Sequence, residues 1–577
     1  MTTSSLPWQA VTPDVEKITQ ILQEHHLEAD FLTLQPRLKS TLSLLCPEIR
    51  QSYHPRFMLL KAPDSPLIYS LLQYNIRKQI PANYGGYAYY ISDNQISLTS
   101  AKNQQDNFAT SDNCLFSTYV DSEALFGCVR QPEGQRLKLQ PGLVHKVNGG
   151  VLILSLRSLL EQQDLWHKLK QMVIWQEFTW LSTDDTNPLP FMIPSMPLDL
   201  RVILVGDRLS MAELQDLEPE FYDSALYTEF ENDVNIHADD NLIKWAGYVK
   251  SVAQFQKLPE IDVSAYAELV KIGIKHTEDQ HYLPLIPDWI NTQLVNAAQV
   301  DNRRINSETI KTASKRKNWQ EDSLIVRLRE AILNKQILIN THDQIIGQIN
   351  GLSVIEYPGH PKAIGEPTRL SCLIHNGDGE INDIERKNDL AGNIHSKGMM
   401  IMQSFITSEF ALSHPLPFSA SLVFEQSYNE VDGDSASLAG LSVIISALSG
   451  QPINQQIAVT GSVDQFGHVQ AIGGVNQKIE GFFAICQHQG LTGQQGVIIP
   501  ASNQNHLCLN DEVVMAIKNN QFHIWAVENV ADALLLLTGI PYNDNSVISL
   551  HKIIKARIQA IINGDKRSAR WFNKWRK

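Results

Sequence analysis

The chain has 577 residues, which is too long for one ordinary core and suggests roughly three or four domains. Apolar residues make up 43% of the chain and charged residues 19%, so the composition excludes a disordered or fibrous protein. The net charge of −14 argues against nucleic acid as the default partner.

No apolar run reaches the ~18 residues that a membrane-spanning helix needs, and MTTSSLPWQA shows no secretory signal pattern. The cysteines are scattered without Cys-x-x-Cys pairs, which favours reduced, buried thiols over disulfides or a zinc site. We therefore expect a cytoplasmic protein that is not bound to a membrane. The six cysteines are Cys46, Cys114, Cys128, Cys372, Cys486 and Cys508.

The N-terminal part reads as a three-layer α/β domain over residues 1–240. Apolar positions at 15, 18, 21 and 22 predict a first helix. RFMLLKAPDSPLIYSLLQYNI then gives a strand, a loop and a helix. GGVLILSL (149–156) and LDLRVILVGD (198–207) are continuous apolar runs, which are typical of buried parallel strands.

Three further segments follow this domain. Residues 241–340 have helical, polar-faced patterns and are predicted to form a helical lid. Strands broken by Pro and Gly then start a second domain over residues 341–540. The tail, 541–577, is basic, because residues 551–577 hold nine Lys/Arg against Asp565. A solvated tail helix is one interpretation, and a contact to an acidic face such as residues 213–240 of another subunit is the alternative.

The N-terminal α/β domain lacks the groups that bind ATP. A phosphate-binding loop needs Gly-x-x-x-x-Gly-Lys-[Ser/Thr], but Gly-Lys occurs nowhere in the chain. KAPDSPLIYS (61–70) places Asp64 and two prolines where the loop belongs, and a carboxylate there would repel phosphate. Ser155 and Leu156 stand where a metal-orienting Asp-Glu pair is expected. We expect neither nucleotide binding nor hydrolysis.

The second domain also lacks familiar metal and hydrolase motifs. There is no His-Glu-x-x-His, no Cys/His cluster at ligand spacing and no Gly-x-Ser-x-Gly. DGDS (432–435) opens like a calcium loop, but Ala436 stands where a third oxygen ligand belongs. No metal or other cofactor is therefore expected.

EVDGDSASLAGLSVIISAL contains a candidate nucleophile, Ser435, at the start of a helix. Asp434 can cap this helix, and apolar residues at 438, 441, 445 and 448 form its buried face. Ser435 would then lie in the first turn, where free backbone N–H groups could bind a developing oxyanion. His414 and His468 are possible bases, but neither has an attached acid motif.

Lys478 is the stronger candidate for the base. In AIGGVNQKIEGFFAIC it lies on the same helix face as the apolar residues Val475, Ile479, Phe482 and Cys486. Burial there would depress the lysine pKa towards neutrality, and the positive end of the helix dipole acts in the same direction. The alternative is a lysine whose amine reaches back to water.

The region from Glu430 to Ile485, which includes VTGSV, resembles the proteolytic domain of Lon proteases. The resemblance covers residues 343–540 and implies a Ser–Lys dyad of Ser435 and Lys478. Thr460 matches the threonine that hydrogen-bonds the lysine in the family, and Asp432 matches an acidic position just before the nucleophile.

Upstream, LQPGLVHKVNGGVLILSL and IPSMPLDLRVILVGD resemble the AAA-type module of Lon-like proteins. NYGGYAYYIS (83–92) is either an aromatic pore loop or a Tyr-rich edge hairpin. The fold class implied is multidomain α/β: a degenerate AAA-type domain with a helical lid, followed by an α+β proteolytic domain.

The function implied is that of an ATP-independent Lon-like serine endopeptidase. The resemblance implies a homo-oligomeric ring, a hexamer, which cleaves unfolded or loosely folded polypeptides. Two alternatives remain at this point. One is a proteolytically inactive ring scaffold or adaptor, and the other is an ATP-dependent Lon protease with an unrecognised nucleotide site.

Overall fold

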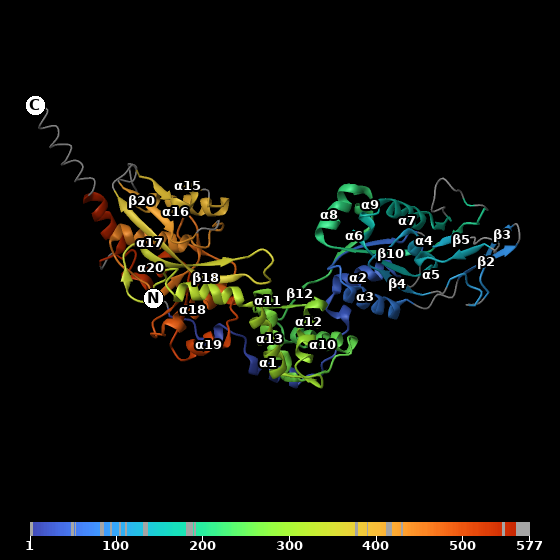
Figure 1. Cartoon of the computed structure of the whole chain (residues 1–577), viewed down its shortest axis with the longest axis horizontal. Coiled ribbons are helices and arrows are strands. Elements are labelled where there is room, and N and C mark those ends of the chain that lie inside the picture. The colour runs from blue at the N-terminus through green and yellow to red at the C-terminus, as the bar shows by residue number, and fades with distance from the viewer. Residues whose placement is uncertain are drawn as a thin grey trace, which may run out of the picture. The chain divides into compact units, whose positions relative to one another are not determined.

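The computed structural model describes residues 4–47, 51, 53–80, 86–92, 95–102, 105–109, 112–130, 137–180, 189, 192–375, 379–388, 390–410, 418–427, 431–544 and 548–560. Its residues group into two compact units. Unit 1 comprises residues 1–20, 262–283 and 306–577, and unit 2 comprises residues 21–261 and 284–305. Each unit has its own sheet (Figure 1) and its own apolar core.

Unit 2 is built on a five-stranded sheet in the order β11-β1-β10-β7-β4. All its pairings are parallel, with Leu59 opposite Leu204 and Ile153 opposite Ile203. The three predicted apolar strands are therefore confirmed as its centre. The strands are β1 (Phe57–Lys61), β4 (Cys114–Ser117), β7 (Val151–Ser155), β10 (Arg201–Gly206) and β11 (Leu226–Glu229).

Helices cover this sheet and make the predicted three-layer α/β domain. The sheet lies between α3 on one side and α6, α7 and α8 on the other (Figure 1). Leu154 and Leu204 contribute to one apolar cluster with Trp166 and Leu214. Ser65 caps α3, since its Oγ accepts from Ile68 N at 3.4 Å. The bounds are α1 (Val15–Gln23), α2 (Pro36–Leu45), α3 (Pro66–Gln79), α6 (Leu156–Leu160), α7 (Gln163–Trp175), α8 (Arg208–Leu217) and α9 (Pro219–Ser224).

The tyrosine-rich segment forms a two-stranded antiparallel hairpin of β2 (Tyr87–Ser92) and β3 (Gln95–Ser100). Tyr89 packs edge-on against Phe108 and Trp180, whereas Tyr90 is exposed. Residues 83–85 of the predicted pore loop lie outside the described residues. The alternative of a Tyr-rich hairpin therefore agrees with the described part of this segment.

The segment predicted as a lid is helical, but its helices are divided between the two units. α10 (Asp239–Phe255) and α12 (Pro287–Ala298) belong to unit 2. Unit 1 contains α11 (Val263–Thr277), α13 (Ser307–Glu321) and α14 (Ser323–Leu333). Residues 1–20 also group with unit 1, where Leu6 N donates to Ile524 O at 2.8 Å. The boundaries at 240, 340 and 540 stay predictions.

Unit 1 is built on a mixed seven-stranded sheet in the order β19-β20-β18-β17-β22-β25-β26. β17, β22, β25 and β26 run parallel to one another, whereas β18 is antiparallel to β17 and β20. The strands are β17 (Gln348–Ile355), β18 (Ile364–His375), β19 (Ile381–Asp383), β20 (Ser419–Phe424), β22 (Ile457–Val459), β25 (Gly496–Pro500) and β26 (His523–Val527).

Alternate residues of the central strands face different helices. Val459 and Ile498 belong to one apolar cluster with the residues of α17, whereas Ala458 and Val497 belong to another with those of α18. α17 and α18 therefore cover opposite faces of the sheet. The helices are α16 (Asn393–Glu409), α17 (Ser437–Ser449), α18 (Val475–Gln489), α19 (Asp511–Lys518) and α20 (Val530–Thr538).

The described start of the basic tail packs on unit 1 rather than extending into solvent. Residues 550–560 are helical, and Leu550, Ile554 and Ile558 are buried in the same cluster as α17. The prediction of a fully solvated tail helix is therefore wrong for this part, because its apolar residues recur every four positions. Residues 561–577 lie outside the described residues.

Candidate active site

Ser435 lies in a turn that leads into α17, two residues before the helix begins at Ser437. The Asp434 carbonyl closes this turn by accepting from Ser437 N at 3.0 Å and Ser437 Oγ at 2.7 Å. Gly433 enters the turn with φ +122°, a conformation that favours glycine. The predicted cap is wrong, because the Asp434 carboxylate accepts from Ser462 Oγ at 2.8 Å instead.

Lys478 lies in the first turn of α18, where its backbone N donates to Gly474 O at 3.1 Å. Its side chain is directed into the protein, and the residue is only 2% exposed. The predicted apolar face is buried with it, at Val475, Ile479, Phe482 and Cys486. The alternative of an amine that reaches back to water does not agree with this burial.

The two side chains meet at the end of β22. Lys478 Nζ lies 2.9 Å from Ser435 Oγ and 3.3 Å from Thr460 Oγ1. Thr460 directly follows β22, and its hydroxyl donates to Ser435 O at 3.3 Å. Gly461 N donates to the same carbonyl at 2.8 Å. Helices on opposite faces of the sheet thus bring the three predicted residues together.

Burial dominates the electrostatics of the lysine. Desolvation lowers the pKa of Lys478 from 10.5 to about 8, and the nearby Asp434 carboxylate opposes part of this effect. Roughly a tenth of the amine would then be neutral at pH 7, with more at higher pH. A neutral amine at this distance can accept the proton of the Ser435 hydroxyl.

The turn also offers donors near Ser435. The backbone N–H groups of Ser435 and Ala436 have no hydrogen-bond acceptor among the described residues. Ser435 itself is only half-buried, so a reacting group can reach it from one side. Such N–H groups are suited to binding negative charge that develops on a carbonyl oxygen.

Asp432 lies at the N-terminus of α16 rather than against the lysine. Its Oδ1 accepts from the backbone N–H groups of Ile394 at 3.1 Å, His395 at 3.4 Å and Gly433 at 3.0 Å. Carboxylates at this position stabilise a helix by capping its free N–H groups. Asp432 therefore ties the loop before Ser435 to α16.

The histidine alternatives receive no support from the described residues. His468 Nδ1 pairs with Asp464 Oδ2 at 2.9 Å, and its side chain is 63% exposed. The prediction that His468 lacks an attached acid is wrong, because Asp464 four residues earlier supplies one through a tight turn. His414 lies outside the described residues.

In unit 2, polar side chains fill the region where a phosphate loop would lie. Asp64 Oδ1 accepts from Tyr69 OH at 2.9 Å, and Asp64 Oδ2 accepts from Ser155 Oγ at 2.6 Å. These contacts join the carboxyl ends of β1 and β7, where nucleotide phosphates and a metal-orienting acid usually meet. Ser65 Oγ donates to Asp288 Oδ2 at 2.5 Å beside them.

The described residues form neither a metal-binding cluster nor a membrane-spanning helix. Within the described part of the chain, no group of three or more His, Cys, Asp or Glu residues could hold a metal ion. None of the described helices is both long enough and apolar enough to cross a bilayer.

Two features of the site were not predicted from the sequence: the effect of Asp434 on Lys478, and the contact of Ser462 with the Asp434 carboxylate. Asp434 lies close enough to influence the pKa of Lys478, and Ser462 fixes its carboxylate. The signal was present in VTGSV, since Ser462 follows Thr460 by two residues. Its significance depended on the contact between that segment and the Ser435 turn, which only the fold reveals.

Comparison with known proteins gives two matching family models. The Lon protease (S16) C-terminal proteolytic domain matches residues 428–538, and a LonB-like AAA domain matches residues 114–226. A Lon protease homolog of Escherichia coli (strain K12) is 46% identical over 566 residues, covering 97% of this chain and 96% of the relative.

Two other relatives extend the comparison. A Lon protease homolog of Haemophilus influenzae is 41% identical over 583 residues, covering 98% of this chain and 95% of the relative. An archaeal Lon protease of Thermoplasma volcanium is 25% identical over 476 residues, covering 76% and 68% of the two chains. The bacterial relatives thus match over nearly the whole length of both chains.

Proposed function

The chain belongs to the Lon protease family, and we propose that it is an ATP-independent serine endopeptidase with a Ser435–Lys478 dyad. The observation that carries this proposal is the 2.9 Å distance between Lys478 Nζ and Ser435 Oγ. The depressed lysine pKa supports it, because a base must be partly neutral near the working pH.

The proposed reaction is acyl transfer. Neutral Lys478 accepts the Ser435 hydroxyl proton while Oγ attacks the substrate carbonyl, and the backbone N–H groups of Ser435 and Ala436 bind the oxyanion. The resulting ammonium then protonates the leaving amine, and the peptide bond breaks. Water hydrolyses the acyl-enzyme ester with Lys478 again acting as the base. Thr460 keeps the amine directed at Ser435.

We propose independence from ATP because of the side chains that lie where the degenerate AAA-type domain would bind nucleotide. Asp64 would repel nucleotide phosphate, and its bonds to Tyr69 and Ser155 fill the place of the phosphate loop. Without the motif lysine and the metal-orienting acids, neither charge neutralisation nor metal binding is provided. We propose that this domain serves assembly and substrate access instead.

We also propose a homo-oligomeric ring that admits unfolded or loosely folded polypeptides. Family membership supports the ring. A protease that does not use ATP has no energy source for unfolding its substrates. Folded proteins should therefore be cleaved slowly and unfolded ones faster.

Fluorophosphonate labelling combined with casein cleavage tests the proposal. Wild type should be labelled at Ser435 and should cleave casein without ATP, whereas Ser435→Ala should do neither. A wild-type protein that is neither labelled nor active would favour the alternative of an inactive ring scaffold. Cleavage that requires ATP would favour an ATP-dependent protease.

A further inference from the structure

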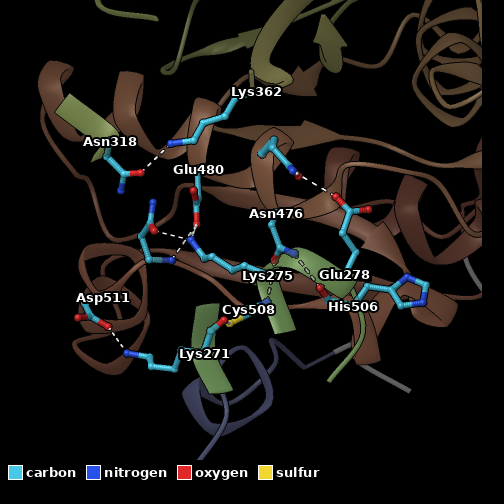
Figure 2. A network of polar contacts seen from close by, with 12 residues as sticks. Lys271, Lys275, Glu278, Asn318, Lys362, Asn476, Glu480, His506, Cys508 and Asp511 are labelled. Carbon is cyan, nitrogen blue, oxygen red and sulfur yellow. Dashed lines mark hydrogen bonds and ion pairs between the residues drawn. The ribbon is translucent and has the colours of Figure 1, made fainter. Parts of the chain in front are cut away.

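The polar side of α18 is held by a network that reaches α11 and the segment before α19 (Figure 2). Asn476, Gln477 and Glu480 flank Lys478 on this helix, with Asn476 buried and the other two residues partly exposed. Each of the three is hydrogen-bonded to another element of unit 1. Lys478 thus lies on a helix whose polar side chains next to it are all bonded to other elements.

An ion pair joins α11 to α18. Lys275 Nζ lies 2.8 Å from Glu480 Oε1 and 2.5 Å from Asn510 Oδ1, and Asn510 N donates to the same Glu480 oxygen at 2.8 Å. Both charged side chains are partly shielded, at 34% and 20% exposure. A shielded pair with a shared third partner has a better-defined geometry than a lone surface pair.

A second contact comes from the end of α11. Gln477 Nε2 donates to Glu278 Oε1 at 3.2 Å. Glu278 ends α11 with φ +54°, a left-handed conformation that few residues other than glycine adopt. At this point the Glu278 side chain reaches α18 (Figure 2).

The first turn of α18 packs so closely on β18 that the helix has little room to move there. A Cβ at Gly365 of β18 would lie 2.0 Å from Gln477 O and 2.6 Å from Lys478 N. The first turn of α18 therefore packs backbone against backbone on this strand. Asn476 Nδ2 donates to His506 O at 2.8 Å, and its Oδ1 accepts from Cys508 N at 2.8 Å. The helix is held from several directions within two residues of the lysine.

We propose that Lys275 and Glu278 of α11 are positioning residues, which hold Lys478 in register with Ser435 through α18. The proposal rests on the dyad proposed above. Loss of the ion pair would let α18 shift, and catalysis is sensitive to displacements of about 1 Å.

Lys275→Met tests the proposal, with Lys271→Met as the matched control. Lys271 lies on the same helix and pairs with Asp511 at 2.6 Å, but that contact does not involve α18. We expect Lys275→Met to lower kcat for a peptide substrate about tenfold with KM nearly unchanged. Lys271→Met should retain wild-type kcat, and Lys275→Arg should recover most of the loss.

The pH profile separates positioning from a merely structural role. An amine that moves away from its buried partners regains water, so the pKa of Lys478 rises. The acid limb of kcat/KM should therefore move to higher pH in Lys275→Met and stay in place in Lys271→Met. Equal kcat and equal acid limbs in the two variants would overturn the proposal.

Two controls keep the result interpretable. If Lys275→Met does not fold, Glu278→Gln carries the same test, because it weakens the hydrogen bond to Gln477 without removing the side chain. An unaltered acid limb and kcat in folded Glu278→Gln would then overturn the proposal. Cleavage retained by Ser435→Ala would instead refute the dyad, whereas an inactive Ser435→Ala with indistinguishable lysine variants would refute only the positioning role.

Discussion

Lys478→Met should stabilise the protein at neutral pH, and the gain should vanish at high pH. Burial lowers the pKa of the folded-state amine from 10.5 to about 8. The difference, at about 1.36 kcal/mol per pH unit, corresponds to about 3 kcal/mol. Below pH 8 both states carry the proton, so the folded state bears the full penalty of a buried charge. Above pH 10.5 neither state carries it and the penalty is zero.

The sign follows from proton binding in the two states. Between the two pKa values the unfolded chain binds more protons than the folded chain, so wild-type stability rises with pH relative to the variant. Urea unfolding of wild type and Lys478→Met at several pH values measures the difference. Methionine also changes the packing, but that contribution does not depend on pH. A stability difference that is constant from neutral pH to above the higher pKa would refute the reasoning.

Three further predictions concern the residues around the dyad and the nucleotide region. Asp434→Asn should move the acid limb of kcat/KM to lower pH, because the Asp434 charge raises the pKa of Lys478; an unmoved limb would contradict this. Asp432→Ala should lower the free energy of unfolding by about 1 kcal/mol through the lost α16 cap, as measured in urea, and an unchanged midpoint would contradict that role. Calorimetry should detect no ATP binding, and ATP with Mg²⁺ should not alter peptide cleavage. Micromolar ATP binding would refute the claim that Asp64 occupies the place of the phosphate loop and repels phosphate.

The strands and the catalytic helix were predictable because their signals are local. The segments 151–155 and 201–206 are almost continuously apolar, which is typical of strands buried on both faces. They form the centre of the unit 2 sheet. Lys478 on an apolar helix face could be identified in the same way, since helix periodicity fixes which residues share a face.

The errors fall where tertiary contacts override local preference. Asp434 before an apolar helix is a reasonable cap by local rules, but Ser462 from a distant segment takes its carboxylate. The tail was predicted from its charge, yet Leu550 and Ile554 bury themselves in the unit 1 core. The division of the helices between the units likewise depends on distant neighbours, since α14 packs on α18 and α12 packs on α3.

The proposed positioning role of α11 could not be predicted from the sequence. Lys275 and Glu480 are 205 positions apart, so nothing local indicates that they meet. Their contact becomes visible only when the fold places α11 against the helix that carries Lys478.

The pH dependence of peptide cleavage by wild type and Ser435→Ala tests the central claim most directly. Wild-type kcat/KM should rise with an apparent pKa of about 8, well below the 10.5 of an ordinary lysine, and Ser435→Ala should be inactive at every pH. A flat profile with chemistry rate-limiting, or cleavage retained by Ser435→Ala, would contradict it.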